Sequence, residues 1–369
     1  MRISFMAVVV GLALGVVGCS KRETVIPVPV GNTTAAEGSV VVVSRAPAPA
    51  PEAPSSQDDA ASLDLDRFSH VFHHGDRAYV VLAQVTEDSW GRGAPSLVSV
   101  DSPVIVRRDV DVAALPRALA RRSGRSVRLV GTSGVVCQGV IGPMSLVGRF
   151  EPHFGTRQDW EGKNHDIGEP DVPLPVEQIA SQAWDDSVAG RVLAAEVIST
   201  TGDCKSALFA RAANLSAPAV IAASPAPPAL ADKAVDALRR LPSYATIEQN
   251  YRQSSASGPG RWEIENGSTD VTFFRGKNGS YVWVSAYGGE ACSDFDAHMV
   301  ALWRVEGEGT PRPTFTLLHE GTDELLPAGV TDIDGDGAVE LLGQERILRR
   351  GGEGYATDSL AVPSFDCPC

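Results

Sequence analysis

The chain has 369 residues and a formal net charge of −14 at pH 7, from 32 basic and 46 acidic side chains. Nucleic-acid-binding proteins carry a basic stripe, and no such cluster occurs here, so we expect no nucleic-acid partner. Hydrophobic residues make up 43% of the chain, enough for a buried core. Only the stretch before Cys19 is continuously apolar. This pattern excludes a membrane protein with several spans.

The amino terminus has the pattern of an export signal. Arg2 precedes a short apolar run that ends in the sequence VVGC at residues 16–19. A charged start, a short apolar core and a small residue at its end are typical of a secretory signal peptide. The simplest interpretation is an ordinary signal peptide, in which the presence of Cys19 has no special function.

The four residues VVGC resemble the lipobox of bacterial lipoproteins. The resemblance implies that residues 1–18 are removed and that Cys19 carries the acyl chains. Several acyl chains on one residue anchor a protein firmly, so the membrane is its first expected partner. Ser20 in place of Asp is similar to the pattern that sorts lipoproteins to the outer membrane of Gram-negative bacteria. We therefore expect a lipid-anchored protein of the cell envelope.

Residues 19–62 are expected to form a disordered tether. A repeat of proline and alanine covers residues 46–54, and it favours the extended polyproline conformation. The following residues are small and polar and have no periodicity that would form a core. Such a segment holds the body of the protein away from the membrane surface.

The body is predicted to have an α+β fold in two regions. In the first region, residues 63–242, strands are expected at 78–85, 97–106, 126–130, 135–141, 145–150 and 191–198, and helices at 112–122, 176–187 and 228–241. Strands and helices without strict alternation favour α+β over a doubly wound sheet. A run of serine and glycine indicates a linker over residues 243–260.

The second region, residues 261–369, is predicted to be an all-β antiparallel meander or small sandwich. Short apolar runs with glycine-rich turns between them indicate strands at 271–275, 280–287, 299–305 and 314–319. Glycine supplies the positive φ angles that tight hairpin turns require.

The sequence TDIDGDGAVEL at residues 331–341 is the sharpest motif of the body. Oxygen ligands at alternate positions form the coordination shell that Ca²⁺ prefers. The predicted ligands are the side chains of Asp332, Asp334, Asp336 and Glu340 and the backbone carbonyl of Ala338. The alternative is a solvated turn, because Asp and Gly are favoured in turns for backbone reasons.

The loop departs from an EF-hand, which has a bidentate Glu at position twelve where this chain has Gly343. With strands expected on both sides, it more closely resembles the DxDGDG loops of FG-GAP (integrin-type) repeats. In those repeats the ions are structural, which implies a structural Ca²⁺ here. The resemblance covers one short loop and implies no fold.

Five cysteines follow Cys19, and export makes disulfides plausible. The simplest pairing joins Cys137 to Cys204, both in the first region. In that case Cys292 pairs with either Cys367 or Cys369.

Two polar clusters remain. His70, His73 and His74 have a spacing that zinc ligands can have, or they belong to the polar start of a strand, and we favour the second interpretation. The acidic segment 290–296 either adds ligands to the calcium loop or faces solvent.

No motif for a serine-hydrolase elbow, a zinc protease, a phosphate loop or a dinucleotide site occurs. We therefore expect a binding or assembly module of the cell envelope rather than an enzyme, with an envelope protein or a glycan as partner. The alternative is an envelope hydrolase that acts on glycan or peptide.

Overall fold

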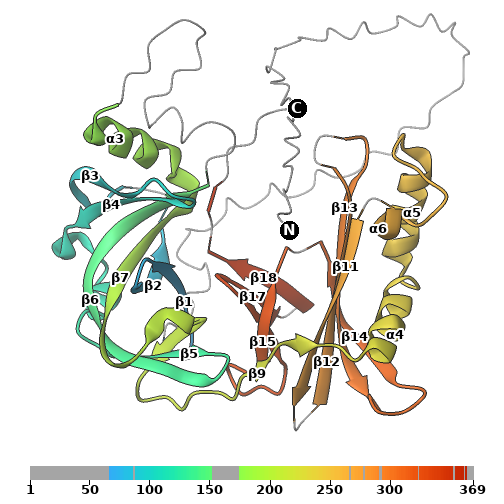
Figure 1. The fold of residues 1–369 in the computed structure, drawn as a ribbon. Helices are drawn as coiled ribbons and strands as arrows, with labels where there is room; N and C mark the ends of the chain where they lie inside the picture. The colour runs from blue at the N-terminus through green and yellow to red at the C-terminus, as the bar shows by residue number, and fades with distance from the viewer. Residues whose placement is uncertain are drawn as a thin grey trace, which may run out of the picture. The chain divides into compact units, whose positions relative to one another are not determined.

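The computed structural model describes residues 66–85, 88–151, 174–265, 267–276, 279–290, 293–322, 324–351, 354–360 and 362–363 (Figure 1). All of them belong to one compact unit, Ala61–Cys367. No helix within these ranges has the length and apolar character needed to cross a membrane. The expected signal peptide, Cys19 and the tether lie outside the described residues and stay predictions.

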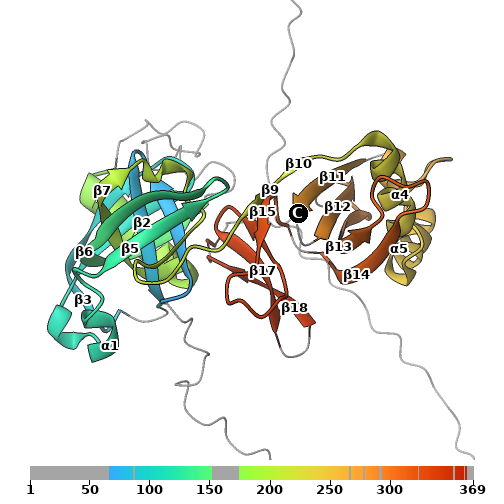
Figure 2. The ribbon, with the colours of Figure 1, turned by 90° about the horizontal axis from the view of Figure 1, so that it is seen from below.

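The first sheet is antiparallel and has eight strands. Figures 1 and 2 show it from two sides. They are β1 (Ser69–His74), β2 (Arg77–Gln84), β3 (Gly91–Ser99), β4 (Val104–Val110), β5 (Ser126–Gly131), β6 (Gly134–Phe150), β7 (Arg191–Gly202) and β8 (Phe209–Ala212). The strand pairs β6–β5–β8–β1–β2–β7–β6 close a ring, so the sheet forms a barrel. The long β6 makes closure possible, because its first half pairs with β5 and its second half with β4, while β7 lies along its other edge.

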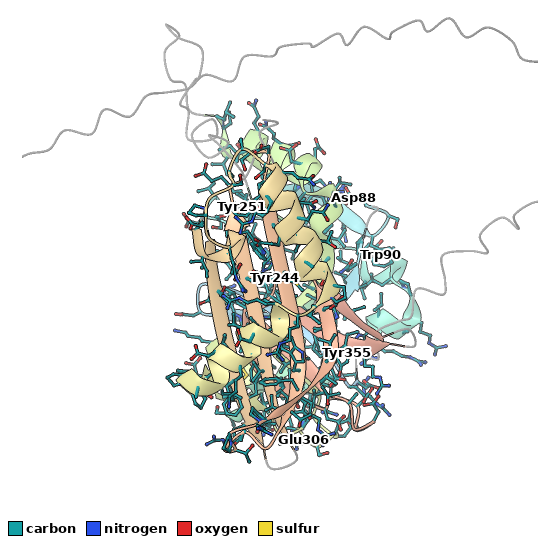
Figure 3. All side chains as sticks on the ribbon, turned by 90° about the vertical axis from the view of Figure 1, so that its right-hand side faces the viewer. Asp88, Trp90, Tyr244, Tyr251, Glu306 and Tyr355 are labelled. Carbon is teal, nitrogen blue, oxygen red and sulfur yellow. A yellow bond between two sulfur atoms is a disulfide. The ribbon has the colours of Figure 1, made fainter. Side chains whose placement is uncertain are left out.

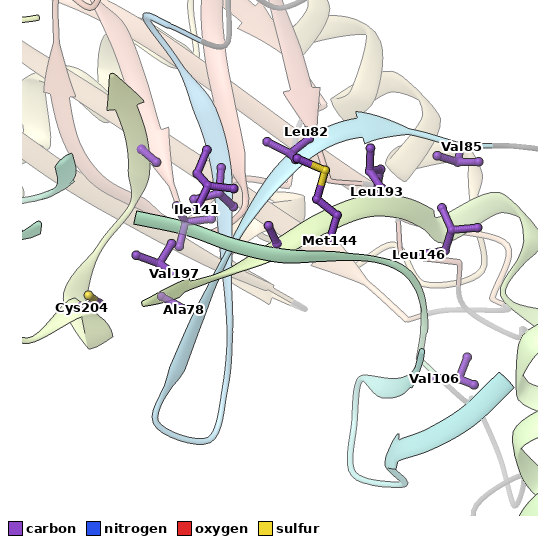
Figure 4. Packing of buried hydrophobic residues seen from close by; sticks show 14 of the residues in the cluster. Ala78, Leu82, Val85, Val106, Ile141, Met144, Leu146, Leu193, Val197 and Cys204 are labelled. Carbon is purple, nitrogen blue, oxygen red and sulfur yellow. The ribbon is translucent and has the colours of Figure 1, made fainter. Parts of the chain in front are cut away.

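The barrel interior is filled by alternate residues of its strands, as the period of two in a strand requires. In β2, Val80 and Leu82 belong to the interior cluster with Leu146 of β6 and Leu193 of β7 (Figure 4). Tyr79 and its neighbours of the same parity pack on the outer face instead. The apolar run from 78 to 85 therefore buries both faces of its strand.

Short helices accompany the barrel. They are η2 (Val112–Ala114), α1 (Arg117–Ala120), α3 (Val176–Asp186), η3 (Val188–Gly190) and η4 (Cys204–Ser206). The helix predicted over 176–187 is confirmed as α3, whose buried Trp184 donates its indole N–H to Asp88 at 2.7 Å. The helix predicted over 112–122 is broken into η2 and α1, because Pro116 lies between them.

A second sheet has the strand order β10-β11-β12-β13-β14. Its strands are β10 (Ser224–Pro225), β11 (Gly267–Gly276), β12 (Gly279–Gly289), β13 (Asp296–Glu306) and β14 (Thr314–Gly321). The helices α4 (Pro228–Leu238), α5 (Pro242–Gln253) and α6 (Trp262–Glu265) pack on one face. Figure 3 shows this helical layer with Tyr244 and Tyr251 of α5 labelled.

A third sheet covers the opposite face of the second one. Its order is β18-β17-β16-β15-β9, with β9 (Ile221–Ala222), β15 (Pro327–Thr331), β16 (Glu340–Gly343), β17 (Arg346–Gly351) and β18 (Gly354–Ser359). Trp283 and Leu302 of the second sheet pack against Val330 and Leu341 of the third. A further cluster joins Ile347 of the third sheet to Phe209 of the barrel.

The α+β prediction is confirmed at this level, and the protein is mainly antiparallel β. The linker predicted over 243–260 is wrong, because α5 occupies residues 242–253. Tyr244 and Tyr251 are seven residues apart, so they share one helix face, and both are buried against the second sheet. The Ser/Gly run that indicates a linker follows this helix, whereas the tyrosine spacing within residues 242–253 indicates the helix itself.

Candidate functional site

The loop between β15 and β16 holds the predicted calcium ligands. Asp332 Oδ1 accepts the N–H of Gly335 at 2.7 Å, and Oδ2 accepts that of Gly337 at 3.0 Å. Both glycines have positive φ angles, 81° and 84°. A side chain at either position would be strained, so the two glycines allow the loop to curl around the Asp332 carboxylate.

The other two aspartates make the same kind of local bond. Asp334 Oδ1 accepts the N–H of Asp336 at 3.1 Å, and Asp336 Oδ1 accepts that of Ala338 at 2.7 Å. One carboxylate oxygen from each of Asp332, Asp334 and Asp336 lies within 4.8 Å of the others. The loop therefore gathers three carboxylates at one point, where a hard divalent cation such as Ca²⁺ finds oxygen ligands.

Glu340 begins β16 below this loop and is 4% exposed. One of its carboxylate oxygens accepts the N–H of Ile333 at 2.7 Å. The pKa of Glu340 is raised to about 7, mainly by burial, while the Ile333 N–H opposes the shift and the three aspartates add to it. The backbone bond uses one oxygen of the predicted ligand Glu340, and the gathered carboxylates are those of the three aspartates. The roles of Glu340 and of the Ala338 carbonyl stay predictions.

The predicted disulfide between Cys137 and Cys204 is confirmed. Cys137 lies on β6 and Cys204 begins η4, so the bond joins the barrel wall to the segment before β8. Cys292, Cys367 and Cys369 lie outside the described residues, so their pairing stays a prediction.

The histidine cluster and the acidic segment 290–296 contribute no side chain to the group of the three loop aspartates. His70 Nε2 lies 3.5 Å from Asp358, and His73 Nε2 lies 3.0 Å from the Cys204 carbonyl oxygen. Asp294 accepts from the backbone and hydroxyl of Ser255. Among the described residues, only the three loop aspartates form a group of His, Cys, Asp or Glu side chains with metal-binding spacing.

A cavity of about 930 Å³ lies in the described part of the chain and was not predicted. Residues of the barrel, of β12 and β13, and of the segments next to β15 and β16 line it. Tyr287 and Leu326, which border it, are 40% and 89% exposed. The only sequence signal is the alternation along β12, which indicates that Ser285 and Tyr287 share a face.

An ion pair of Arg149 and Glu345 lies at this cavity. Arg149 is 2% exposed, donates from Nη2 to Glu345 at 2.7 Å, and stacks 4.5 Å over the Phe72 ring. Its Nε and Nη1 have no hydrogen-bond partner. Glu345 has a φ of 60° and is the one non-glycine residue with positive φ in the part of the chain that the structure describes.

Comparison of the chain with models of known protein families, with curated proteins and with solved structures found no match. A proposal for the function therefore depends on the residues of this chain and their geometry.

Proposed function

We propose that this chain is a lipoprotein of the bacterial cell envelope, anchored in the outer membrane through Cys19, whose body binds a ligand. An envelope protein or a glycan is the expected partner. The observation that carries the binding role is the cavity of about 930 Å³ at the junction of the barrel and the two following sheets. Ligand sites in proteins have volumes of roughly 300–1,000 Å³ and place a few polar groups among apolar ones.

The polarity of the cavity supports a binding role. Tyr287 is partly exposed and Leu326 almost fully exposed beside it, so both offer apolar surface to a ligand in the cavity. Arg149 contributes a buried guanidinium with two unpaired nitrogens. A ligand with an apolar part and hydrogen-bond acceptors would satisfy both features.

The disulfide supports export. Disulfides persist in oxidising compartments and are rare in the bacterial cytosol. The Cys137–Cys204 bond therefore fits a chain that carries a lipobox-like signal.

The aspartate loop supports a structural calcium ion. Three carboxylates at one point repel one another, and Ca²⁺ would offset this repulsion and stiffen the β15–β16 hairpin. Asp332, Asp334 and Asp336 would hold the ion.

Affinity capture from detergent-solubilised envelopes, with the full-length protein as bait, tests the proposal. We expect a reproducible partner whose capture is lost with Leu326→Asp and kept with Leu317→Asp. Leu317 is the matched control, because it is also exposed but does not line the cavity. Mass spectrometry of the same preparation should find an acylated amino-terminal Cys19. Equal capture by both variants, or an unprocessed amino terminus, would contradict the proposal.

The second candidate is a hydrolase. One specific observation favours it, the contact between Ser285 and His298 in this cavity.

A further inference from the structure

A serine and a histidine meet on the cavity wall. Ser285 Oγ of β12 and His298 Nε2 of β13 are 2.9 Å apart, which is hydrogen-bond distance. The strand register pairs Ser285 with Val300 and Tyr287 with His298, so the serine and the histidine are diagonal neighbours on one face of the sheet. Both line the cavity of about 930 Å³.

The histidine has an unused nitrogen. His298 Nδ1 is buried and has no hydrogen-bond partner. Buried polar atoms in folded proteins are nearly always paired with protein or water. The contact with Ser285 is therefore made through Nε2, and Nδ1 has no partner within the described protein.

A hydrogen-bond donor stands beside the pair. Tyr287 is the direct cross-strand neighbour of His298 and lines the same cavity. Burial raises the pKa of Tyr287, and the nearby carboxylates of Asp296, Glu290 and Glu324 add to this. The phenol therefore stays protonated at neutral pH and can donate a hydrogen bond.

We propose that Ser285 is a nucleophile and His298 its general base, for hydrolysis of a carboxylic ester bound in this cavity. A serine hydroxyl is a weak nucleophile until an adjacent imidazole takes its proton, and a separation of 2.6–3.2 Å is the usual distance for that transfer. This inference rests on the proposed function, because it uses the same cavity as the ligand site.

The reaction balances with water as the only co-reactant. Ser285 Oγ bonds to the ester carbonyl carbon while its proton moves to His298 Nε2. The carbon–oxygen bond to the alcohol then breaks, and Nε2 returns the proton to the leaving alcohol. Water attacks the acyl-serine and gives a proton to Nε2, the bond to Oγ breaks, and Ser285 recovers its proton.

Other cavity residues have roles that follow from their positions. Tyr287 lines the same cavity, and in the proposed reaction its hydroxyl donates to the oxyanion that develops on the carbonyl oxygen. Leu325 and Leu326 offer apolar surface to the acyl or alcohol part of the ester. The substrate class is therefore an ester with a sizeable apolar group.

The direct test uses the full-length protein in detergent. The protein is labelled with a fluorescent fluorophosphonate, and its hydrolysis of p-nitrophenyl butyrate is measured. We expect the label on Ser285 by peptide mass spectrometry. Ser285→Ala should abolish labelling and hydrolysis, and His298→Gln should lower both by about 10²- to 10⁴-fold. Tyr287→Phe should lower hydrolysis by about 10²-fold. The control Ser199→Ala changes an exposed serine of β7 and should leave both unchanged.

A second readout covers the case in which Ser285→Ala misfolds. Ser285→Cys places a thiol next to His298, so iodoacetamide should alkylate it at pH 7 faster than the thiol of Ser199→Cys. A label on another serine, or no label on the wild-type protein, would overturn the inference. Equal alkylation of the two cysteine variants would overturn it as well. Failure here, with Leu326-dependent capture intact, would leave the binding proposal standing.

Discussion

Glu340 lies where the loop of Asp332, Asp334 and Asp336 meets the core, and its environment disfavours a negative charge. Its carboxyl is almost fully buried, accepts the backbone N–H of Ile333, and lies near three aspartates. The same three aspartates each place one carboxylate oxygen within 4.8 Å of the others, a spacing that could hold a cation. The protonation of Glu340 and the occupancy of the loop are therefore expected to influence each other.

The stability of the metal-free protein is predicted to depend on pH through Glu340. The folded-state pKa, about 7, lies above the ordinary value of 4.5. The contribution of the neutral carboxyl to stability is therefore complete below pH 4.5 and lost as the pH rises through 7. A shift of this size corresponds to roughly 3 kcal/mol.

Thermal unfolding in EDTA between pH 5 and pH 8 measures this effect. The wild-type melting temperature should fall over this range relative to that of Glu340→Gln, whose amide keeps an acceptor for the Ile333 N–H. Parallel curves for the two proteins would contradict the prediction.

Calcium is predicted to stabilise the protein through the loop aspartates. A ligand at 100 times its dissociation constant stabilises the folded state by about 2.7 kcal/mol. Calcium should therefore raise the melting temperature of the wild-type protein, and Asp334→Ala should abolish the rise. Asp270→Ala, which removes an exposed carboxylate of β11, is the control and should keep it. Equal melting of the wild-type protein in calcium and in chelator would refute a calcium site.

At the scale of elements, the disulfide links the part of the barrel wall where β6 pairs with two other strands to the segment before β8. Cys137 lies in the half of β6 that pairs with both β5 and β7, and Cys204 lies just before β8. The two cysteines are 67 residues apart in sequence. Cross-linking a loop of this length removes many conformations of the unfolded chain and stabilises the fold by about 4 kcal/mol in the chain-entropy model.

Removal of this bond is predicted to lower the free energy of unfolding by about 2–4 kcal/mol. Urea unfolding of the variant Cys137→Ser with Cys204→Ser measures the loss. Dithiothreitol should destabilise the wild-type protein by a similar amount and change the double variant much less. An undiminished midpoint in the double variant would show that the bond does not contribute to stability.

The helical layer on the second sheet depends on a buried polar network. Glu263 of α6 accepts from the Tyr244 hydroxyl at 2.7 Å and from Arg239 Nη2 at 2.9 Å. Burial and the neighbouring Glu263 raise the pKa of Tyr244, so its hydroxyl remains a donor. The network connects α4, α5 and α6, which explains why residues 242–253 form a packed helix rather than a linker.

At the scale of the whole molecule, Arg149 and Glu345 join residues from distant parts of the sequence. Arg149 lies at the end of β6, and Glu345 lies in the turn between β16 and β17. In this turn Glu345 has a positive φ angle although it is not glycine, and its side chain forms an ion pair with the buried guanidinium of Arg149. The ion pair and the strained turn are therefore coupled.

Glu345→Ala is predicted to destabilise the protein by roughly 3 kcal/mol, because it leaves the Arg149 charge buried without its partner. Glu345→Gly should cost about 1 kcal/mol less, since glycine accepts a positive φ without strain. Chemical denaturation of both variants measures the difference. Equal losses would indicate that the backbone of the turn is not strained.

How far the sequence could predict this molecule depends on the distance between interacting residues. The aspartates of the calcium loop are neighbours in sequence, so their spacing predicts their proximity. The same holds for most strands, which follow from local apolar patterns. Ser285 and His298 meet through the register of β12 and β13, and Arg149 meets Glu345 through packing across the unit. Such contacts depend on strand pairing and packing between distant segments, so the local sequence pattern does not predict them.

The position of β8 in the barrel has a consequence for the order of events during synthesis. β8 lies between β5 and β1, yet it follows every other barrel strand in the chain. A nascent polypeptide that ends before Phe209 leaves facing edges of β5 and β1 without hydrogen-bond partners. Sealing of the ring must therefore wait until Ala212 has emerged.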